Sequence, residues 1–315
     1  MYVWCKKAMP GKKRKDREQY SALKYGYYHL STDGWKDGFL FHTNAQYAFG
    51  MTVIGLLTLL FDVKIYAFSL MPNHIHIILS GTGRECLKAF DYLRLKLSGC
   101  LVKDGYAPLP DDYWFKLVAI ETPIQMRNNF LYVDRNAYEH HVCIPSGYPW
   151  GSCYLYYSFI HQMITAPRAD SLSKRKLERI TGTRISIPGH WRFHPEYGLL
   201  PSSFVDKSLF TKLFDDPKDY ESRLVKDYEA FVKVAGTLDE TLEYSKEDII
   251  EIVRQVLNIS YSGRRLSQLS NDEKGRMTVT LMKQYKMPEP QIAKAMDMSE
   301  RMVRQFLNAK DYGKR

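Results

Sequence analysis

The sequence is poor in cysteine, in long apolar runs and in internal repeats, and each shortage excludes a class of protein. Its five cysteines form no CxxC pair, so a disulfide framework or zinc knuckle is not expected and a reducing cytoplasm fits. The longest apolar run, MTVIGLLTLLF at 51–61, is too short to cross a bilayer. No signal peptide is expected, because the basic residues near the start are not followed by an apolar core region.

The charge of the sequence is positive and uneven. The chain has 315 residues, a length that suits two or three modest domains, and its hydrophobic content of 45% is enough for a core in each. The formal net charge is +10. Residues 1–25 hold eight basic side chains against two acidic ones. Such a segment suits a polyanion such as nucleic acid, although a solvated, mobile terminus has the same composition. Its candidate contacts to nucleic acid are Lys12, Lys13, Arg14, Lys15 and Arg17.

The order of elements in the first 150 residues predicts an α+β fold. Alternation and helical spacing indicate, in chain order, a strand, a helix, two strands joined by a turn, a helix, a strand and a third helix. The expected ranges are 23–32, 44–61, 62–71, 74–79, 81–105, 113–121 and 123–142. This is the β-α-β-β-α-β order of ferredoxin-like folds with one additional helix. We therefore expect an antiparallel sheet with helices on one face.

The remaining chain predicts a mainly helical carboxy-terminal region. Prolines and glycines leave only short helical pieces before residue 245, with helices expected at 171–182 and 216–236. Four helical segments follow, and the last two, 288–297 and 299–310, are short and joined by a tight turn, as in a helix-turn-helix. A small helical bundle without DNA contacts has the same spacing. The expected domains are 1–19, 20–160, 161–244 and 245–315.

Two histidines interrupt the apolar strand in AFSLMPNHIHIILSG, residues 67–81. Because side chains alternate along a strand, His74 and His76 are expected to project to one side, with Ile75 and Ile77 on the opposite, core-facing side. Two imidazoles that converge in this way can bind a divalent ion. A pair of histidines on a solvated sheet face would give the same pattern.

A second pair of polar residues lies in the third predicted helix. Tyr132 and Asn136 are four residues apart, so they share one helical face. If this helix packs beside the sheet and faces the histidines, Asn136 can supply an oxygen ligand and Tyr132 a phenolic nucleophile.

These motifs, in this order, resemble those of the REP-associated tyrosine transposases, which belong to the single-tyrosine HUH endonucleases. The resemblance covers roughly residues 20–160. It rests on YYHL (27–30), YAFSLMPNHIHIIL (66–79), LYVDRNAYEHHV (131–142) and GYPWGSCYLYY (147–157). It implies a ferredoxin-like HUH domain that cleaves and rejoins single-stranded DNA with the help of a metal ion.

Matched residue by residue, the resemblance implies that His74, His76 and Asn136 bind the metal, Mg²⁺ or Mn²⁺, and that Tyr132 is the nucleophile. Attack by Tyr132 would give a 5′-phosphotyrosine and a free 3′-OH. The family run Tyr-Ile-His-x-Asn-Pro-Val is YVDRNAY here, so Asp134 replaces the histidine and Ala137 the proline. These departures put local helix geometry and DNA selection in question.

The expected partner is DNA that contains a hairpin next to a single-stranded recognition sequence, in the cytoplasm of a prokaryote and associated with its nucleoid. Tyr27 and Trp35 are candidates to stack on bases. The carboxy-terminal helix would contact duplex DNA through Arg301, Arg304, Gln305 and Asn308. A monomer and a homodimer both fit. The alternatives are a DNA-binding regulator that keeps the HUH fold without cutting, and a replication or conjugation relaxase.

Overall fold

A computed structural model describes residues 11–32, 38–139, 147–157 and 164–309 of the chain. These residues form two compact units. Of the described residues, the first unit comprises those up to 138 and those of 147–224, and the second comprises 225–309 with residue 139. Among the described residues, no helix is both long and apolar enough to span a membrane.

The first unit contains a four-stranded antiparallel sheet. Its strands are β1 (Gly26–Thr32), β2 (Lys64–Leu70), β3 (Ile75–Gly81) and β4 (Phe115–Ile120). Their order is β2-β3-β1-β4, with every neighbouring pair antiparallel. This order belongs to the ferredoxin-like arrangement, so the predicted α+β class and strand sequence are confirmed.

One face of the sheet carries the apolar core. Leu30 of β1, Phe68 of β2 and Ile77 of β3 are paired across the sheet and fully buried. Helices α2 (Asn44–Leu60) and α3 (Gly83–Lys103) cover them. Both helices begin at a threonine whose side chain accepts a backbone N–H, as N-cap residues do.

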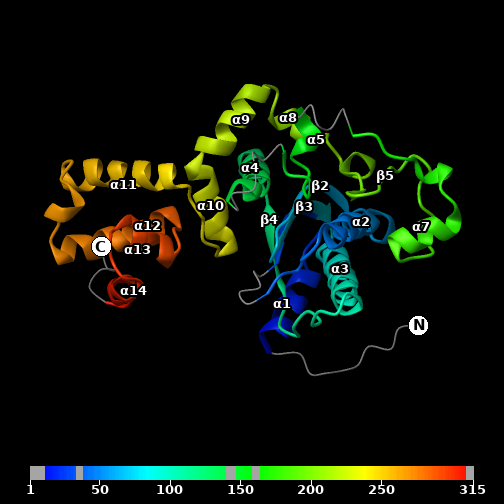
Figure 1. The fold of residues 1–315 in the computed structure, drawn as a ribbon, viewed down its shortest axis with the longest axis horizontal. Helices are drawn as coiled ribbons and strands as arrows, with labels where there is room; N and C mark the ends of the chain where they lie inside the picture. Colours follow the sequence, from blue (N-terminus) through cyan, green and yellow to red (C-terminus); the bar gives the residue numbers. More distant parts are fainter. Residues whose placement is uncertain (1–10, 33–37, 140–146, 158–163, 310–315) are drawn as a thin grey trace. The chain divides into compact units, whose positions relative to one another are not determined.

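Helix α4 (Pro123–Glu139) lies on the opposite face of the sheet, as Figure 1 shows, so the expectation of helices on one face is wrong for this element. Its Tyr132 ring approaches the rings of His29 and His76, which point away from α2 and α3. The reason is the strand period of two: His29 and His76 alternate with the apolar residues that bury against α2. A polar face therefore faces α4.

The predicted connecting region does not form a unit of its own. Its described first part packs on α2, where Leu56, Trp191, Phe193 and Leu199 share a cluster. The elements of residues 154–226 are α5 (Tyr154–Tyr157), η2 (Ala169–Ser171), α7 (Lys174–Thr181), β5 (Phe193–His194), β6 (Gly198–Leu199), η3 (Pro201–Ser203), α8 (Phe210–Leu213) and α9 (Pro217–Lys226).

The single helix expected at 216–236 is two helices. Helix α9 ends at Lys226, and α10 (Tyr228–Leu238) begins after Asp227, whose side chain accepts the N–H of Ala230 at 3.2 Å. Asp227 is thus an N-cap in the middle of an apolar pattern that looks continuous. The boundary between the two compact units falls at Leu224, next to this break.

The second unit is helical. Besides α10 it contains α11 (Lys246–Tyr261), η4 (Leu266–Gln268), α12 (Asn271–Tyr285), α13 (Glu289–Ala295) and α14 (Glu300–Asn308). All four predicted helical segments are present, and Ser270 and Ser299 are the N-caps of α12 and α14. The chain turns between α13 and α14 at Asp297, whose φ is +49°. A short helix, a tight turn and a second short helix are therefore present.

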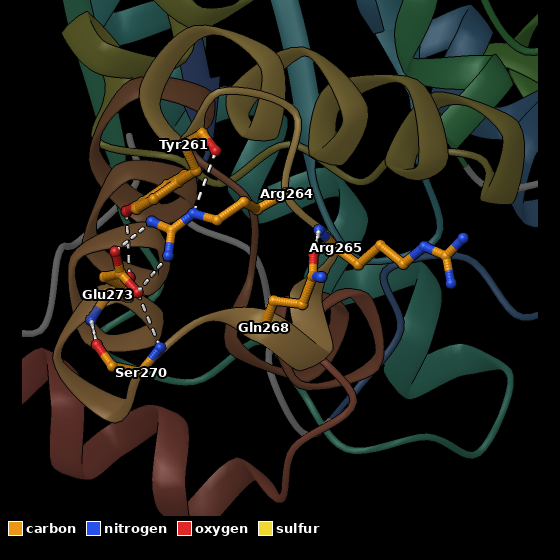
Figure 2. Close-up of polar contacts among 6 residues, drawn as sticks. All are labelled: Tyr261, Arg264, Arg265, Gln268, Ser270 and Glu273. Atoms are coloured by element: carbon orange, nitrogen blue, oxygen red, sulfur yellow. Dashed lines mark hydrogen bonds and ion pairs between the residues drawn. The ribbon is translucent and has the colours of Figure 1, made fainter.

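A polar network closes the connection between α11 and α12, as Figure 2 shows. Arg264 forms an ion pair with Glu273, and the hydroxyl of Tyr261 donates to the carbonyl of Glu273 at 3.1 Å. Ser270 and Glu273 form a capping box, with Ser270 N–H donating to the Glu273 carboxylate at 2.9 Å. The Arg264 side chain, followed by the Ser270 hydrogen bonds, lowers the pKa of Glu273 to about 2.

Candidate functional site

Both histidines of the stretch 67–81 lie at the start of one strand. His76 is in β3 and fully buried, whereas His74 is half-buried and lies just before β3, which begins one residue later than predicted. The reason is the hairpin turn, in which Met71 N–H donates to the carbonyl of His74 at 2.9 Å. The two ring centroids are 4.8 Å apart. Ile75 and Ile77 are buried in the core, as expected.

Helix α4 brings the predicted tyrosine and asparagine to these histidines. The Tyr132 ring centroid lies 5.5 Å from that of His76. The Asn136 side chain lies against His74, with 3.2 Å between Oδ1 and Nε2. The amide of Asn136 also donates through Nδ2 to the carbonyl of Tyr132 at 2.8 Å. Because a carbonyl only accepts, this bond fixes Oδ1 as the atom that faces His74.

A third histidine, which the sequence reading did not single out, completes the cluster. His29 of β1 is fully buried, and its Nε2 lies 3.0 Å from Nδ1 of His76. Its Nδ1 lies 2.6 Å from Oδ1 of Asn129, a residue of α4 that was also missed. Strand alternation places residues 27, 29 and 31 on one face, but the pairing of Ser31 with His76, which brings His29 to the site, is not readable from the sequence.

This chain of contacts sets the protonation of His76. Nδ2 of Asn129 donates to the carbonyl of Gln125 at 2.8 Å, so Oδ1 of Asn129 accepts from Nδ1–H of His29. Burial lowers the pKa of His29 to about 4, so its ring is neutral and its Nε2 accepts. The donor to that Nε2 is Nδ1–H of His76. A neutral His76 therefore carries its lone pair on Nε2, the form that ligates a metal.

The donor set around His74 fits a divalent ion. Nδ1 of His74 lies 2.8 Å from Oδ1 of Asn73, and the tautomer that donates to Asn73 carries its lone pair on Nε2, facing the Asn136 oxygen. Two acceptors at 3.2 Å repel each other unless a cation or proton lies between them. Adjacent octahedral ligands, each about 2.1 Å from Mg²⁺, are about 3 Å apart. Among the described residues no group of three or more His, Cys, Asp or Glu side chains could hold a metal, so a metal bound here would take the Asn136 amide as its third protein ligand.

Asp134, one of the two departures from the motif that the sequence resembles, is hydrogen-bonded to a residue of α9. It is buried, and the hydroxyl of Tyr220 in α9 donates to its carboxylate. The Tyr220 oxygen also lies 3.4 Å from Sγ of Cys153. Burial raises the pKa of Asp134 to about 7, against the opposing effect of hydrogen bonds from Tyr220 and Cys153. The departure at this position thus ties α4 to α9. The other departure, Ala137, is buried in the core, and α4 continues past it.

The candidate DNA contacts of the first unit are scattered. Helix α1 (Gly11–Ser21) contains Lys12, Lys13, Arg14 and Lys15, of which Lys15 is exposed. Arg17 donates to the Asp91 carboxylate, at 3.0 Å for Nη1, and its guanidinium lies 5.1 Å from the Trp114 ring. This gives Arg17 a structural role in holding α1 to α3. Tyr27 is 39% exposed, and Trp35 lies outside the described residues.

The candidate contacts of the second unit share one face of α14. They are exposed and line a shallow hollow of about 450 Å³; they are Arg301, Arg304, Gln305 and Asn308. Arg304 also pairs with Glu289 at 2.8 Å and Glu300 at 3.1 Å, so part of its charge is already balanced.

Comparison with known proteins gives a distant likeness. No family model and no curated protein matches the chain. A solved structure of a REP-associated tyrosine transposase bound to a REP hairpin is similar over 49% of this chain and 84% of that chain, with 15% identity and a TM-score of 0.35. This likeness is too distant to indicate a function.

Proposed function

We propose that the first unit is a metal-dependent, single-tyrosine DNA endonuclease and strand transferase that acts on single strands beside hairpins. The observation that carries the proposal is the meeting of Tyr132 and Asn136 from α4 with His74 and His76 from the other side of the site. Two imidazoles and an amide beside a tyrosine form a set that packing alone does not require. The resemblance of residues 20–160 to the REP-associated tyrosine transposases supports the same reading.

Tyr132 is the nucleophile in this proposal. Its phenolic oxygen attacks the phosphorus in line with the leaving 3′ oxygen, the P–O3′ bond breaks, and a 5′-phosphotyrosine and a 3′-OH result. The phenolic proton passes to solvent, and the leaving oxygen gains one. A divalent ion held by His74, His76 and Asn136 would polarise the phosphate oxygens. A second 3′-OH that attacks the phosphotyrosine restores the phosphodiester and the free tyrosine without ATP.

The buried position of Tyr132 has a consequence for DNA binding. The residue is 4% exposed, so strand binding has to open the cover over this face of α4 before attack. The same burial favours the alternative of a regulator that binds DNA through this fold without cutting it. The exposed face of α14 is proposed as a duplex contact under either reading, since it presents arginine and amide side chains together.

A covalent-adduct assay tests the proposal. The protein is incubated with 5′-flanked hairpin DNA and Mn²⁺, and denaturing gels are examined for a protein–DNA adduct. We expect an adduct with the wild type and none with Tyr132→Phe. With His74→Ala we expect a lower adduct yield that a higher Mn²⁺ concentration restores. Hairpin binding without an adduct under any metal would favour the regulator. An adduct of unchanged yield in a His74→Ala, His76→Gln variant would show that the metal site is misassigned.

A further inference from the structure

The first unit contains a second concave site, built largely from a region that the family resemblance does not cover. It has a volume of about 800 Å³ and lies between the start of α2, helix α7 and the β5–β6 hairpin. Figure 1 shows α7 and β5 beyond α2, away from α4. None of the proposed catalytic or metal-binding residues lines it. Its volume lies within the range of about 300–1,000 Å³ that small-molecule sites occupy.

The hairpin wall of this hollow is fixed directly to α2. Leu199 N–H donates to Oγ1 of Thr52 at 3.2 Å, and the Thr52 hydroxyl donates to the carbonyl of Ala48 at 2.9 Å. Gly198 has a φ of +70°, and a Cβ there would lie 2.1 Å from the Ala48 oxygen. Only glycine allows this approach without a backbone shift. The wall is therefore held by buried bonds.

Helix α7 forms the opposite wall and is anchored at its end. Nζ of Lys96 in α3 donates to the carbonyl of Gly182, the residue that ends α7 in a left-handed conformation. At its start, Ser173 caps the helix by accepting the N–H of Lys176 at 3.3 Å. Both ends of α7 are thus held, so the backbone that carries its side chains towards the hollow is fixed.

Three ring side chains that line the hollow, Trp150, His194 and Tyr197, form what we call its floor. Tyr197 stacks on His194 with ring centroids 4.5 Å apart, and it meets the Trp150 ring edge-on at 5.7 Å. Trp150 is itself stacked on Tyr47. Nδ1 of His194 accepts the backbone N–H groups of Glu196 and Tyr197, so Nε2 carries the ring proton and is a donor. Aromatic surfaces of this kind stack on nucleic-acid bases.

Two basic side chains also line the hollow. Lys176 and Arg179 are exposed residues of α7 that line the hollow, and they are three residues apart, on one helical face. Glu196 is the one carboxylate among the residues that line it. The hollow therefore contains both basic side chains that can bind an anion and aromatic rings on which a base can stack.

We infer that this hollow binds one unpaired nucleotide, with its base against Tyr197 and its phosphate on Lys176 and Arg179. The inference rests on the proposed function in one respect: the nucleotide belongs to the single strand that the protein processes. The floor is connected to the catalytic side through Trp150, whose carbonyl accepts the N–H of Leu70 at 2.8 Å. Leu70 ends β2, just before the turn that carries His74.

Charge-reversal variants of the full chain test the inference. Binding of a fluorescent single strand is measured by anisotropy for the wild type, for Lys176→Glu with Arg179→Glu, and for Arg175→Glu as a control on the same helix outside the hollow. We expect the double variant to bind at least about 10-fold more weakly than the control. Equal affinities of the double variant and the control would overturn the inference.

Abasic substitution along the strand locates the stacked base. In the wild type, loss of one particular base should weaken binding by about 10-fold, and Tyr197→Ala should remove this dependence while Tyr197→Phe retains it. If no position in the strand depends on Tyr197, the hollow does not hold a base. A parallel titration with a free deoxynucleoside monophosphate separates a small-molecule site from a strand site: binding of the monophosphate alone, without strand dependence, would contradict the strand assignment.

These binding measurements are independent of catalysis. A wild type that forms no covalent adduct but shows the Tyr197-dependent base position would refute the proposed cleavage and support the nucleotide site. If the wild type forms the adduct while the double variant binds the strand like Arg175→Glu, the proposed cleavage is supported and the nucleotide site is refuted.

Discussion

Nε2 of His29 lies 3.0 Å from Nδ1 of His76, so a histidine from β1 determines which nitrogen of the β3 histidine carries the proton. Second-layer partners of this kind orient metal-binding histidines and raise their basicity. The layer continues through Asn129 to the backbone of α4. Helix α4 therefore supplies Tyr132, the proposed nucleophile. Through Asn129 and His29, α4 also orients His76, whose ring lies next to that of Tyr132.

The first prediction concerns this second layer. His29→Asn should weaken Mn²⁺ binding by about 10- to 100-fold, because His76 loses the acceptor that fixes its tautomer. The measurement is a Mn²⁺ titration followed by electron paramagnetic resonance or calorimetry. His194→Asn, at a histidine remote from His76, is the control and should leave Mn²⁺ affinity unchanged. Wild-type affinity in a folded His29→Asn protein would contradict the role.

The second prediction concerns the tie between α9 and α4. Tyr220→Phe removes the hydroxyl that donates to buried Asp134, so the free energy of unfolding of the first unit should fall by about 1–3 kcal/mol. Urea unfolding, followed by a probe in the first unit, measures this change. Tyr106→Phe is the control, since Tyr106 is 39% exposed, and it should change the same free energy by less than about 0.5 kcal/mol.

The sheet and its polar face follow from the sequence because strand alternation is a local signal. The positions of His76, Tyr132 and Asn136 could be anticipated from periods of two and about 3.6 residues. His29 could not be selected in this way, since its importance depends on the pairing of Ser31 with His76, a register that joins residues 45 apart in sequence. A single histidine in an apolar strand carries no local mark of that pairing.

Residues 161–244 were least predictable, for a different physical reason. Their elements are short, and the β5–β6 hairpin is stabilised by contacts to α2 rather than by its own periodicity, as Gly198 on Ala48 illustrates. The break at Asp227 was missed because an N-cap aspartate is compatible with a continuous helical pattern until its side-chain bond is known. Because of this break, the helical unit includes α10 and begins at residue 225 rather than at the expected residue 245.

The third prediction uses the network of Figure 2 to give a pH dependence. The pKa of Glu273 is lowered to about 2 in the folded protein, below the usual value of 4.5. Its ionised form therefore contributes stability that is present above about pH 4.5 and is lost as the pH falls towards 2. Glu273→Gln should flatten this part of the acid-unfolding curve of the second unit, measured by circular dichroism. Glu247→Gln, at an exposed glutamate outside the network, should leave the slope intact.

The fourth prediction separates duplex binding from chemistry. Arg301→Ala should weaken binding to hairpin DNA with a flanking duplex and, if Arg301 contacts a phosphate, reduce the salt slope by about 1. It should leave cleavage of a short, saturating single strand unchanged, because the variant lies in the second unit. Arg254→Ala removes an exposed arginine of α11 that pairs with Glu251 and is the control. Equal duplex affinities of the two variants would leave α14 as a packing element.

The last prediction is that the covalent intermediate forms at Tyr132 and at no other tyrosine. Tyr154 and Tyr156 lie in the stretch GYPWGSCYLYY, and burial raises the pKa of each phenol well above its usual value. The hydroxyl of Tyr156 is also committed to the carbonyl of Tyr66, at 2.5 Å. Neither is therefore suited to attack a phosphate.

Peptide mapping of the trapped adduct by mass spectrometry decides this assignment. We expect the phosphotyrosine in the peptide that contains Tyr132, and its absence after Tyr132→Phe, with Mn²⁺ affinity and strand affinity preserved because the ring remains in place. Tyr156→Phe should keep the adduct. A modified Tyr138 would place the nucleophile six residues further along α4, about 120° away around the helix at about 100° per residue. That result would also displace Asn136 from the metal, since both assignments depend on the face of α4 that meets His74 and His76.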